Sequence, residues 1–277
     1  MAADERDEFD TPLAGLPSSN RQVLGETHIE AAVAEVRFVA DRTELPESEA
    51  IQVWRALGPE DYPVFEKSAL NSWNLTVTPD GAGGTSARQD GWVVASASRD
   101  LTVTLLPSMV IVQNSNYERF STGLAEPLRR ALEPFVAATG AQVINRIGLR
   151  YINRLAATEA TTPGYWAEQV RPEFAGPMHG ELASLVQGIH QQLQLRLDQT
   201  AGARIQSGVF REAGIDEKYS FLVDLDVYRE QAIPFDAELC ANLTRQLNRT
   251  AFALFSQVLS PDFIEGLDPH VEVEVQT

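Results

Sequence analysis

The sequence predicts an α+β protein in which an antiparallel sheet carries long helices on one of its faces. Two stretches, residues 117–139 and 235–258, repeat apolar residues in steps of three and four, which is typical of amphipathic helices. The segments between them are short, rich in β-branched residues and bounded by turn residues, as strands are. The order strand, helix, several strands, long helix occurs twice. The prediction is therefore two tandem β-α-β-β-β-α halves that share one sheet.

The first half begins with a strand at residues 28–39. A helix follows near Pro46, with acidic residues in its first turn, and stops before Gly58. The remaining strands of this half are expected at residues 71–78, 91–98, 101–105 and 109–113. Residues 79–84 (PDGAGG) predict a flexible connection between the first two. The long helix at 117–139 contains Pro127, which indicates a kink or a restart with this proline in a first turn, and Gly140 ends it.

The second half repeats this order. Its strands are expected at residues 143–155, 192–198, 204–210 and 219–228, and its short helices at 163–170 and 180–188. The second long helix opens at Phe235-Asp236, where Asp236 is a suitable N-cap. Four segments follow from this pattern: a polar N-terminal arm (1–26), a first α+β half (27–140), a second α+β half (141–265), and a tail or edge strand (266–277) in which HVEVEV alternates.

Composition limits the function. The chain has 277 residues, 44% of them hydrophobic, which suits a globular protein with a sizeable core. Its formal net charge of −17 disfavours general nucleic-acid binding and suits a protein partner with a basic surface. The N-terminus lacks a signal-peptide pattern, and no apolar run approaches the roughly 20 residues that span a bilayer. We expect a soluble cytoplasmic protein that does not bind membranes.

Several chemistries lack their motifs. No Walker-type glycine loop occurs and no GxGxxG opens a helix, and no cofactor is expected. The four histidines form no His-x-x-x-His pair, so no metal site is expected. The single cysteine, Cys240, excludes an intramolecular disulfide and is interpreted as a small buried side chain on a helix.

The most informative segment is residues 146–154 (RIGLRYINR). Read as a strand, it places Arg146, Arg150 and Arg154 in one row with Gly148, while Ile147, Leu149 and Tyr151 face the core. Charged rows on strands are usually exposed or paired across strands, so the favoured interpretation is that carboxylates hold these arginines. Three carboxylates are candidates for this role: Asp224, Asp226 and Glu35.

The alternative is an anion-binding site. Arg146, Arg150 and Arg154 would clamp a carboxylate or phosphate, since guanidinium groups bind these anions in a bidentate way. Gly148 would allow close approach, and Tyr151 and Asn153 would belong to the same ligand-binding site, where Asn153 adds polar contacts.

Asp224 and Asp226 allow a third interpretation. Lying two apart in a strand, they share a face, and paired aspartates can hold Mg²⁺ or divide acid and base roles. No third acidic ligand lies near them in sequence, which favours a role as partners of the arginines. They are weak catalytic candidates.

Residues 146–153 resemble the R-x-G-L-R-Y-x-N signature of a sporadically distributed bacterial family of uncharacterised proteins. Residues 28–38 and the closing helix, with Phe235-Asp236 at its start and FALF at 252–255, are similar to that family as well. The family usually has a Leu-His pair where this chain has Leu247-Asn248, which counts against a catalytic histidine there. The resemblance implies a standalone cytosolic protein with a role in genetic conflict or regulation, and it supplies no catalytic residue.

The predicted function is that of a non-catalytic binding or regulatory protein, such as an accessory or antitoxin-like partner in a bacterial defence or mobile-element locus. Its partner would be a protein with a basic surface, and a small anion could occupy the arginine row. The first alternative is an enzyme acting on a phosphorylated or carboxylate-bearing substrate through the Asp/Arg site. The second is a self-assembling structural protein, a homo-oligomer that uses a free sheet edge.

Overall fold

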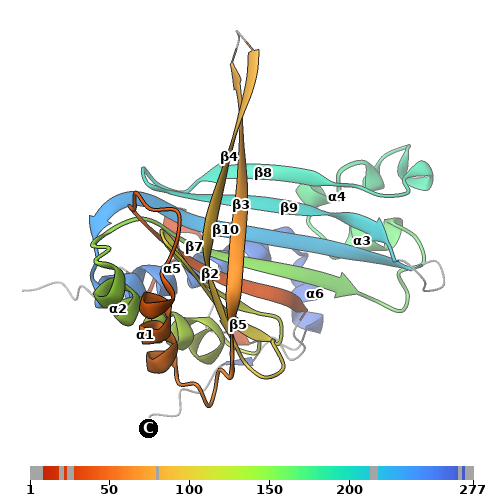
Figure 1. Ribbon diagram of the computed structural model, residues 1–277. Helices are drawn as coiled ribbons and strands as arrows, with labels where there is room; N and C mark the ends of the chain where they lie inside the picture. The colour runs from red at the N-terminus through yellow and green to blue at the C-terminus, as the bar shows by residue number, and fades with distance from the viewer. Residues whose placement is uncertain are drawn as a thin grey trace, which may run out of the picture.

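The computed structural model describes residues 9–18, 22–23, 28–78, 81–212, 218–267 and 270–271. It is an α+β protein built on a large antiparallel sheet, as predicted (Figure 1). The first half contains β2 (Ile29–Phe38), α1 (Glu47–Leu57), β3 (Val64–Thr78), β4 (Gly81–Ala95), β5 (Leu101–Leu106), β6 (Met109–Asn114) and α2 (Glu126–Thr139). The second half contains β7 (Val143–Ala156), α3 (Gly164–Gln169), α4 (Pro172–Ala175), β8 (Gln191–Arg196), β9 (Ala201–Arg211), β10 (Tyr219–Pro234), α5 (Ala237–Val258) and α6 (Pro261–Gly266).

The sheet has nine strands in the order β3-β4-β5-β6-β2-β7-β10-β9-β8. The strands before α2 fill one side of it and the strands after α2 fill the other. The first strand of each half, β2 or β7, lies at the centre, where the two pair antiparallel. The last strand of each half pairs with the first strand of the same half, so β6 lies beside β2 and β10 lies beside β7. The first half has four strands between its helices, one more than the predicted repeat unit.

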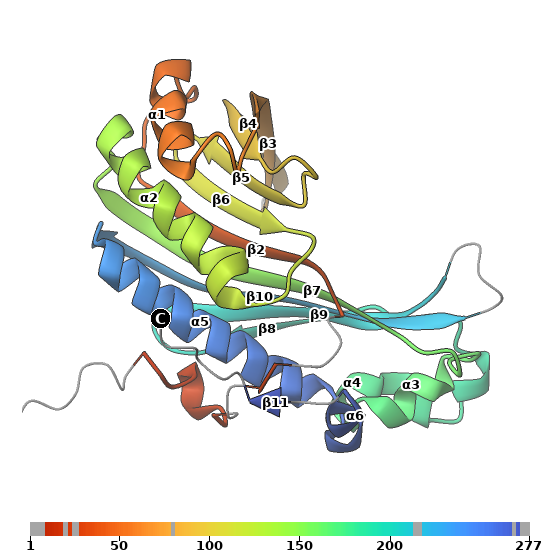
Figure 2. The same ribbon diagram turned by 90° about the horizontal axis from the view of Figure 1, so that it is seen from below.

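Helices α1, α2 and α5 lie side by side on one face of the sheet (Figure 2), and none of the long helices among the described residues lies on the other face. The strands bury the residues that point toward these helices. In β2 the buried side chains are Ala32, Ala34, Val36 and Phe38, in β7 they include Ile147, Leu149 and Tyr151, and in β10 they include Phe221, Val223, Leu225 and Val227. The predicted core face of residues 146–154 is therefore confirmed.

The long helix of the first half starts later than predicted. A π-helical turn at Ser121–Ala125 precedes α2, and Pro127 stands in the first turn of α2, where a missing N–H leaves no bond unmade. Gly140 ends α2 in the left-handed conformation, with φ of 71°, as a glycine after a helix commonly does. Asp236 caps α5 as predicted, and its side chain accepts a hydrogen bond from the Leu239 N–H at 2.7 Å.

Two predictions in loop-rich sequence are wrong. Residues 180–188 form only a short 3₁₀ turn at Ala183–Leu185 instead of a helix. The Ile189 N–H donates to the Val209 carbonyl, so the chain after this turn is already bound to the sheet. Residues 81–84, predicted as flexible, belong to β4. Strands β3 and β4 are 15 residues each and pair along their whole length, which makes the hairpin that stands out in Figure 1.

The N-terminal end of the described chain packs against α5. Pro12 is buried, the Leu13 N–H donates to Thr250 Oγ1 at 3.1 Å, and Arg249 forms an ion pair with Asp10 at 2.6 Å. Near the C-terminus β11 (His270–Val271) pairs with β1 (Gln22–Val23) in a separate small sheet. The alternating segment therefore does not extend the large sheet there, and residues 272–277 lie outside the described residues. Within the described parts of the chain, no helix is both long and apolar enough to cross a membrane.

Candidate functional site

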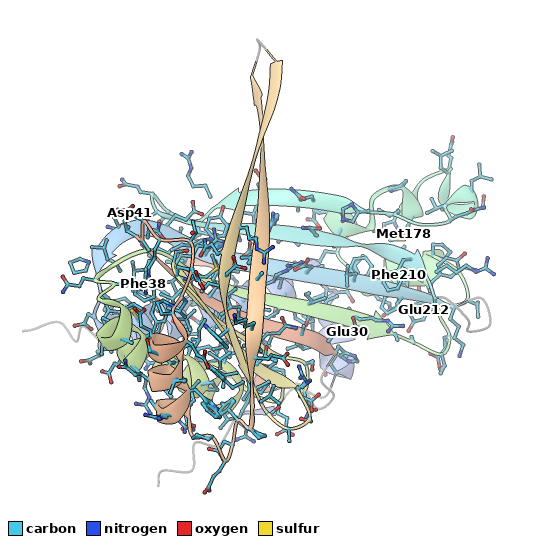
Figure 3. All side chains as sticks on the ribbon, in the orientation of Figure 1. Glu30, Phe38, Asp41, Met178, Phe210 and Glu212 are labelled. Atoms are coloured by element: carbon cyan, nitrogen blue, oxygen red, sulfur yellow. The ribbon has the colours of Figure 1, made fainter. Side chains whose placement is uncertain are left out.

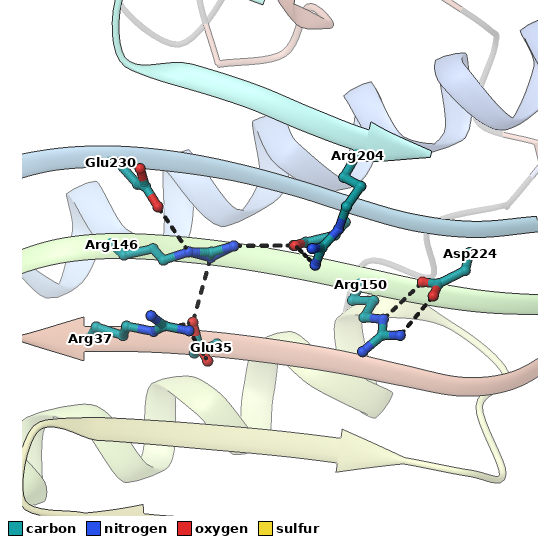
Figure 4. A network of polar contacts seen from close by, with 8 residues as sticks. Glu35, Arg37, Arg146, Arg150, Arg204, Asp224 and Glu230 are labelled. Atoms are coloured by element: carbon teal, nitrogen blue, oxygen red, sulfur yellow. Dashed lines mark hydrogen bonds and ion pairs between the residues drawn. The ribbon is translucent and has the colours of Figure 1, made fainter. Parts of the chain in front are cut away.

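The arginine row lies on the face of the sheet opposite α1, α2 and α5, and carboxylates surround it; Figure 4 shows those around Arg146 and Arg150. Arg150 binds Asp224 with two hydrogen bonds, Nε to Oδ1 at 2.8 Å and Nη2 to Oδ2 at 2.6 Å. The hydrogen bond to Asp224 is the main reason that the pKa of Arg150 is raised. The Asp224 side chain is only 9% exposed, whereas that of Arg150 is 44% exposed. The pair therefore joins a buried anion to a cation that reaches the surface.

Arg154 is held at one end of the sheet, where Glu30 and Glu212 also lie (Figure 3). Its Nε donates to Glu212 at 2.8 Å and its Nη1 to Glu30 at 3.0 Å, and its Nη2 also binds Glu212. The hydrogen bonds from Arg154 lower the pKa of Glu212, and Ser220 adds a smaller effect in the same direction. The third arginine of the row thus has its own pair of acidic partners.

Arg146 fills the space above Gly148. A Cβ atom on Gly148 would lie 2.6 Å from Arg146 Nη1, and the guanidinium also stacks over the Tyr228 ring at 4.5 Å. The carboxylates around it are Glu35 at 3.5 Å, Asp226 at 3.3 Å and Glu230 at 3.4 Å. Gly148 therefore makes room for a neighbouring side chain. The prediction that a ligand approaches the backbone closely at Gly148 is wrong, because the Arg146 guanidinium occupies that space.

Asp226 connects two arginines, since it binds Arg146 and also Arg204, the latter at 3.1 Å. Together with Asp224 and Glu35 it matches the predicted set of partners for the arginine row. Across the residues that the structure describes, no group of three His, Cys, Asp or Glu side chains is placed to hold a metal ion. The arrangement fits the structural interpretation of the row.

Tyr151 and Asn153 lie on the opposite face of β7 from the arginines. Side chains alternate along a strand, so these odd-numbered residues point toward the helices. The Tyr151 hydroxyl donates to Asn248 Oδ1 on α5 at 2.7 Å, and Asn153 Nδ2 donates to the Val223 carbonyl at 3.0 Å. The predicted site that combined them with the arginine row is thus split between the two faces of the sheet.

Tyr151 and Asn153 instead form part of the floor of a cavity between α2 and α5. Its volume is about 570 Å³. Leu225 of β10 completes the floor, and residues of the N-terminal segment, Asp10 and Pro12 among them, line one side. Sequence reasoning did not find this cavity, because it depends on how far apart the two helices stand. The sequence signal that could have indicated the cavity is the presence of two polar side chains, Tyr151 and Asn153, at core-facing positions of β7.

The interior of the cavity is mostly apolar, with uncharged hydrogen-bonding groups. Apolar lining residues come from both helices: Leu128, Leu132, Phe252 and Phe255. Burial, with a smaller effect of Tyr117, raises the pKa of Tyr151 well above its usual value. Burial also raises the pKa of the Cys240 thiol to about 11. At neutral pH both groups are protonated and uncharged.

The charged residues that line the cavity include four arginines and three carboxylates: Arg119, Arg129, Arg245, Arg249, Asp10, Glu118 and Glu126. This balance is positive on a chain of net charge −17. Arg249 is paired with Asp10. Arg129 and Arg245 are exposed, and neither forms an ion pair with any described residue.

Comparison with known proteins gives no family for this chain. No protein-family model and no curated protein matches it. Among solved structures, the RNA triphosphatase Pct1 of S. pombe matches 87% of this chain and 85% of its own with 8% identity and a TM-score of 0.12. The resemblance to the signature family therefore stays a prediction.

Proposed function

We propose that this chain is a non-catalytic binding protein that takes a small molecule into the cavity between α2 and α5. The observation that carries the proposal is the cavity itself, whose volume of about 570 Å³ falls within the roughly 300–1,000 Å³ typical of ligand pockets. Such pockets combine apolar walls with a few well-placed polar groups that orient the ligand. The hydroxyl of Tyr151, the side chain of Asn248 and the thiol of Cys240 are groups of this kind.

The two buried ionisable groups of the lining, Cys240 and Tyr151, favour binding over catalysis. A nucleophilic thiol has a lowered pKa, but burial raises that of Cys240 to about 11. A general base must lose its proton near neutral pH, which the raised pKa of Tyr151 prevents. Asp224 and Asp226, the aspartates of the enzyme alternative, lie on the other face of the sheet in ion pairs with arginines.

The same proposal includes a regulatory role, in which the protein with its ligand bound is recognised by a partner protein. The acidic surface suits a basic protein partner, and the resemblance of residues 146–153 implies a role in conflict or regulation. A ligand enclosed between one helix of each half can favour one arrangement of the two halves, which a partner protein can then recognise.

The test is a fluorescence titration with N-phenyl-1-naphthylamine, an uncharged apolar probe that brightens when it leaves water. We expect saturable binding of one probe per chain and a rise in melting temperature at saturation. Ala241→Trp fills the cavity from α5 and should abolish binding. Glu238→Trp adds the same ring on the same helix outside the lining and should leave binding intact. Absence of saturable binding, or equal binding by the two variants, contradicts the proposal.

A further inference from the structure

We infer that the ligand of this cavity carries an acidic group and that Arg129 and Arg245 bind it at the mouth. The inference rests on the proposed function and adds the chemical class of the ligand. Arg129 belongs to α2 and Arg245 to α5, so the two residues line one cavity from its two helical walls. Both side chains are exposed, which places their charges where the cavity meets solvent.

Arg129 and Arg245 differ from the arginines of the row and from Arg249, which form ion pairs with carboxylates. Arg146, Arg150 and Arg154 each bind carboxylates of the sheet, and Arg249 binds Asp10. Arg129 forms no ion pair with a described residue. Arg245 contacts the uncharged Asn242 side chain, Nη1 to Oδ1 at 3.0 Å. On a strongly acidic chain, two cations that face one cavity without a carboxylate partner are suited to an anion from outside.

The helical stretch before and within α2 adds to this preference. Phe120 and Ser121, at the N-terminal end of the stretch, also line the cavity. The N-terminal end of a helix carries partial positive charge and favours nearby anions. Glu118 and Glu126 offset part of this effect, which leaves the two unpaired arginines as the main attraction for an acidic group.

The lining then defines the ligand as an amphiphilic organic acid. Its apolar body contacts Leu128, Leu132 and Phe252, and its carboxylate, sulfonate or phosphate group lies at the mouth. Deeper in the cavity, the Tyr151–Asn248 pair offers a hydrogen-bonding position for a polar substituent. A neutral molecule of the same shape gains the apolar contacts but loses the charge-assisted hydrogen bonds.

A matched pair of probes tests the acidic group. 1-Anilinonaphthalene-8-sulfonate is the same arylamine as N-phenyl-1-naphthylamine with a sulfonate added. We expect wild-type protein to bind the sulfonate at least about tenfold more tightly, and the advantage to fall as salt is raised. In Arg129→Gln/Arg245→Gln the advantage should vanish while the neutral probe binds as before. Arg129→Lys/Arg245→Lys should keep part of it, since the charges remain.

Arg55→Gln/Arg196→Gln is the matched control, because both arginines are exposed, form no ion pair with a described residue and do not line the cavity. It makes the same change in net charge and should keep the full advantage. If the neutral probe binds but the sulfonate binds no better, or if the control loses as much as the cavity variant, the inference is overturned and the proposed function stands. If neither probe binds, the proposed function fails and the inference fails with it.

Discussion

Arg150 pairs with Asp224 diagonally across β7 and β10, although Asp226 is the residue directly opposite it in the register. Asp226 is instead shared by Arg146 and Arg204. As a result Asp226 lies beside Arg146, and Asp224 lies beside Arg150. Each cation of the row therefore has a distinct set of acidic partners, and for Arg146 and Arg150 the aspartate partners are offset from the strand register.

The unequal burial of this pair predicts unequal effects of mutation. Arg150→Met leaves the Asp224 carboxylate buried without its partner, so we expect a loss of about 2–3 kcal/mol in the free energy of unfolding. Asp224→Asn leaves Arg150 free to reach solvent and keeps an acceptor oxygen, so a loss of about 1 kcal/mol is expected. Urea denaturation measures both. Equal costs, or a larger cost for Asp224→Asn, would contradict the burial argument.

Gly148→Ala should act through Arg146. The added Cβ would lie 2.6 Å from Arg146 Nη1, so the guanidinium must shift and its contacts with Glu35 and Asp226 are weakened. We expect a loss of about 0.5–1.5 kcal/mol in the free energy of unfolding, because the hydrogen bonds of a nearly buried cation are weakened. The same substitution in an Arg146→Ala background should cost much less, and a double-mutant cycle gives this coupling energy. An additive cycle would show that Gly148 serves the backbone alone.

Cys240 offers a direct report on the cavity, because it is the single cysteine and lines the wall. With a pKa of about 11, the thiol should react with iodoacetamide far more slowly at pH 8 than the same thiol in urea-unfolded protein. Saturation with N-phenyl-1-naphthylamine should slow the reaction further. Mass spectrometry follows the modified fraction. A reaction rate that the probe does not change would place the bound molecule elsewhere.

Glu212 should make stability depend on pH in the acidic range. Its pKa is lowered in the folded protein, so its pairing with Arg154 and Ser220 stabilises the fold fully above the ordinary glutamate range of about 4.3. The stabilisation is lost as the pH falls through the lowered pKa. The difference in unfolding free energy between wild type and Glu212→Gln should therefore be largest at pH 7 and shrink below about pH 4. Glu173→Gln, at an exposed carboxylate without an ion pair among the described residues, is the control.

The strand pattern of the sequence was enough to predict the fold class and the partners of the arginine row. Alternation along residues 146–154 and 219–228 placed Arg150 and Asp224 on one face, and side-chain parity is a local property that tertiary contacts rarely change. The same alternation predicts that Asn153 lies on the face opposite the arginines. The sequence alone therefore argues against placing Asn153 in the arginine site.

The cavity and the role of Gly148 could not be predicted in this way. The cavity requires the separation of α2 from α5, which depends on packing between segments about a hundred residues apart. The Arg146 side chain covers Gly148 because Glu35 of β2 and Asp226 of β10 attract it from both neighbouring strands. Neither the periodicity nor the composition of the sequence predicts where the Arg146 side chain lies, because that position depends on residues of three strands.

The meeting of the two halves along β2 and β7 has a consequence for how the protein could be divided. Only residues 140–142 join α2 to β7, and each half supplies one helical wall of the cavity. A chain cut at this connection should yield two fragments that assemble through strand pairing, and a molecule enclosed between their helices would tighten that assembly. The protein would then serve as a split reporter, in which complementation of two fragments records the presence of the small molecule.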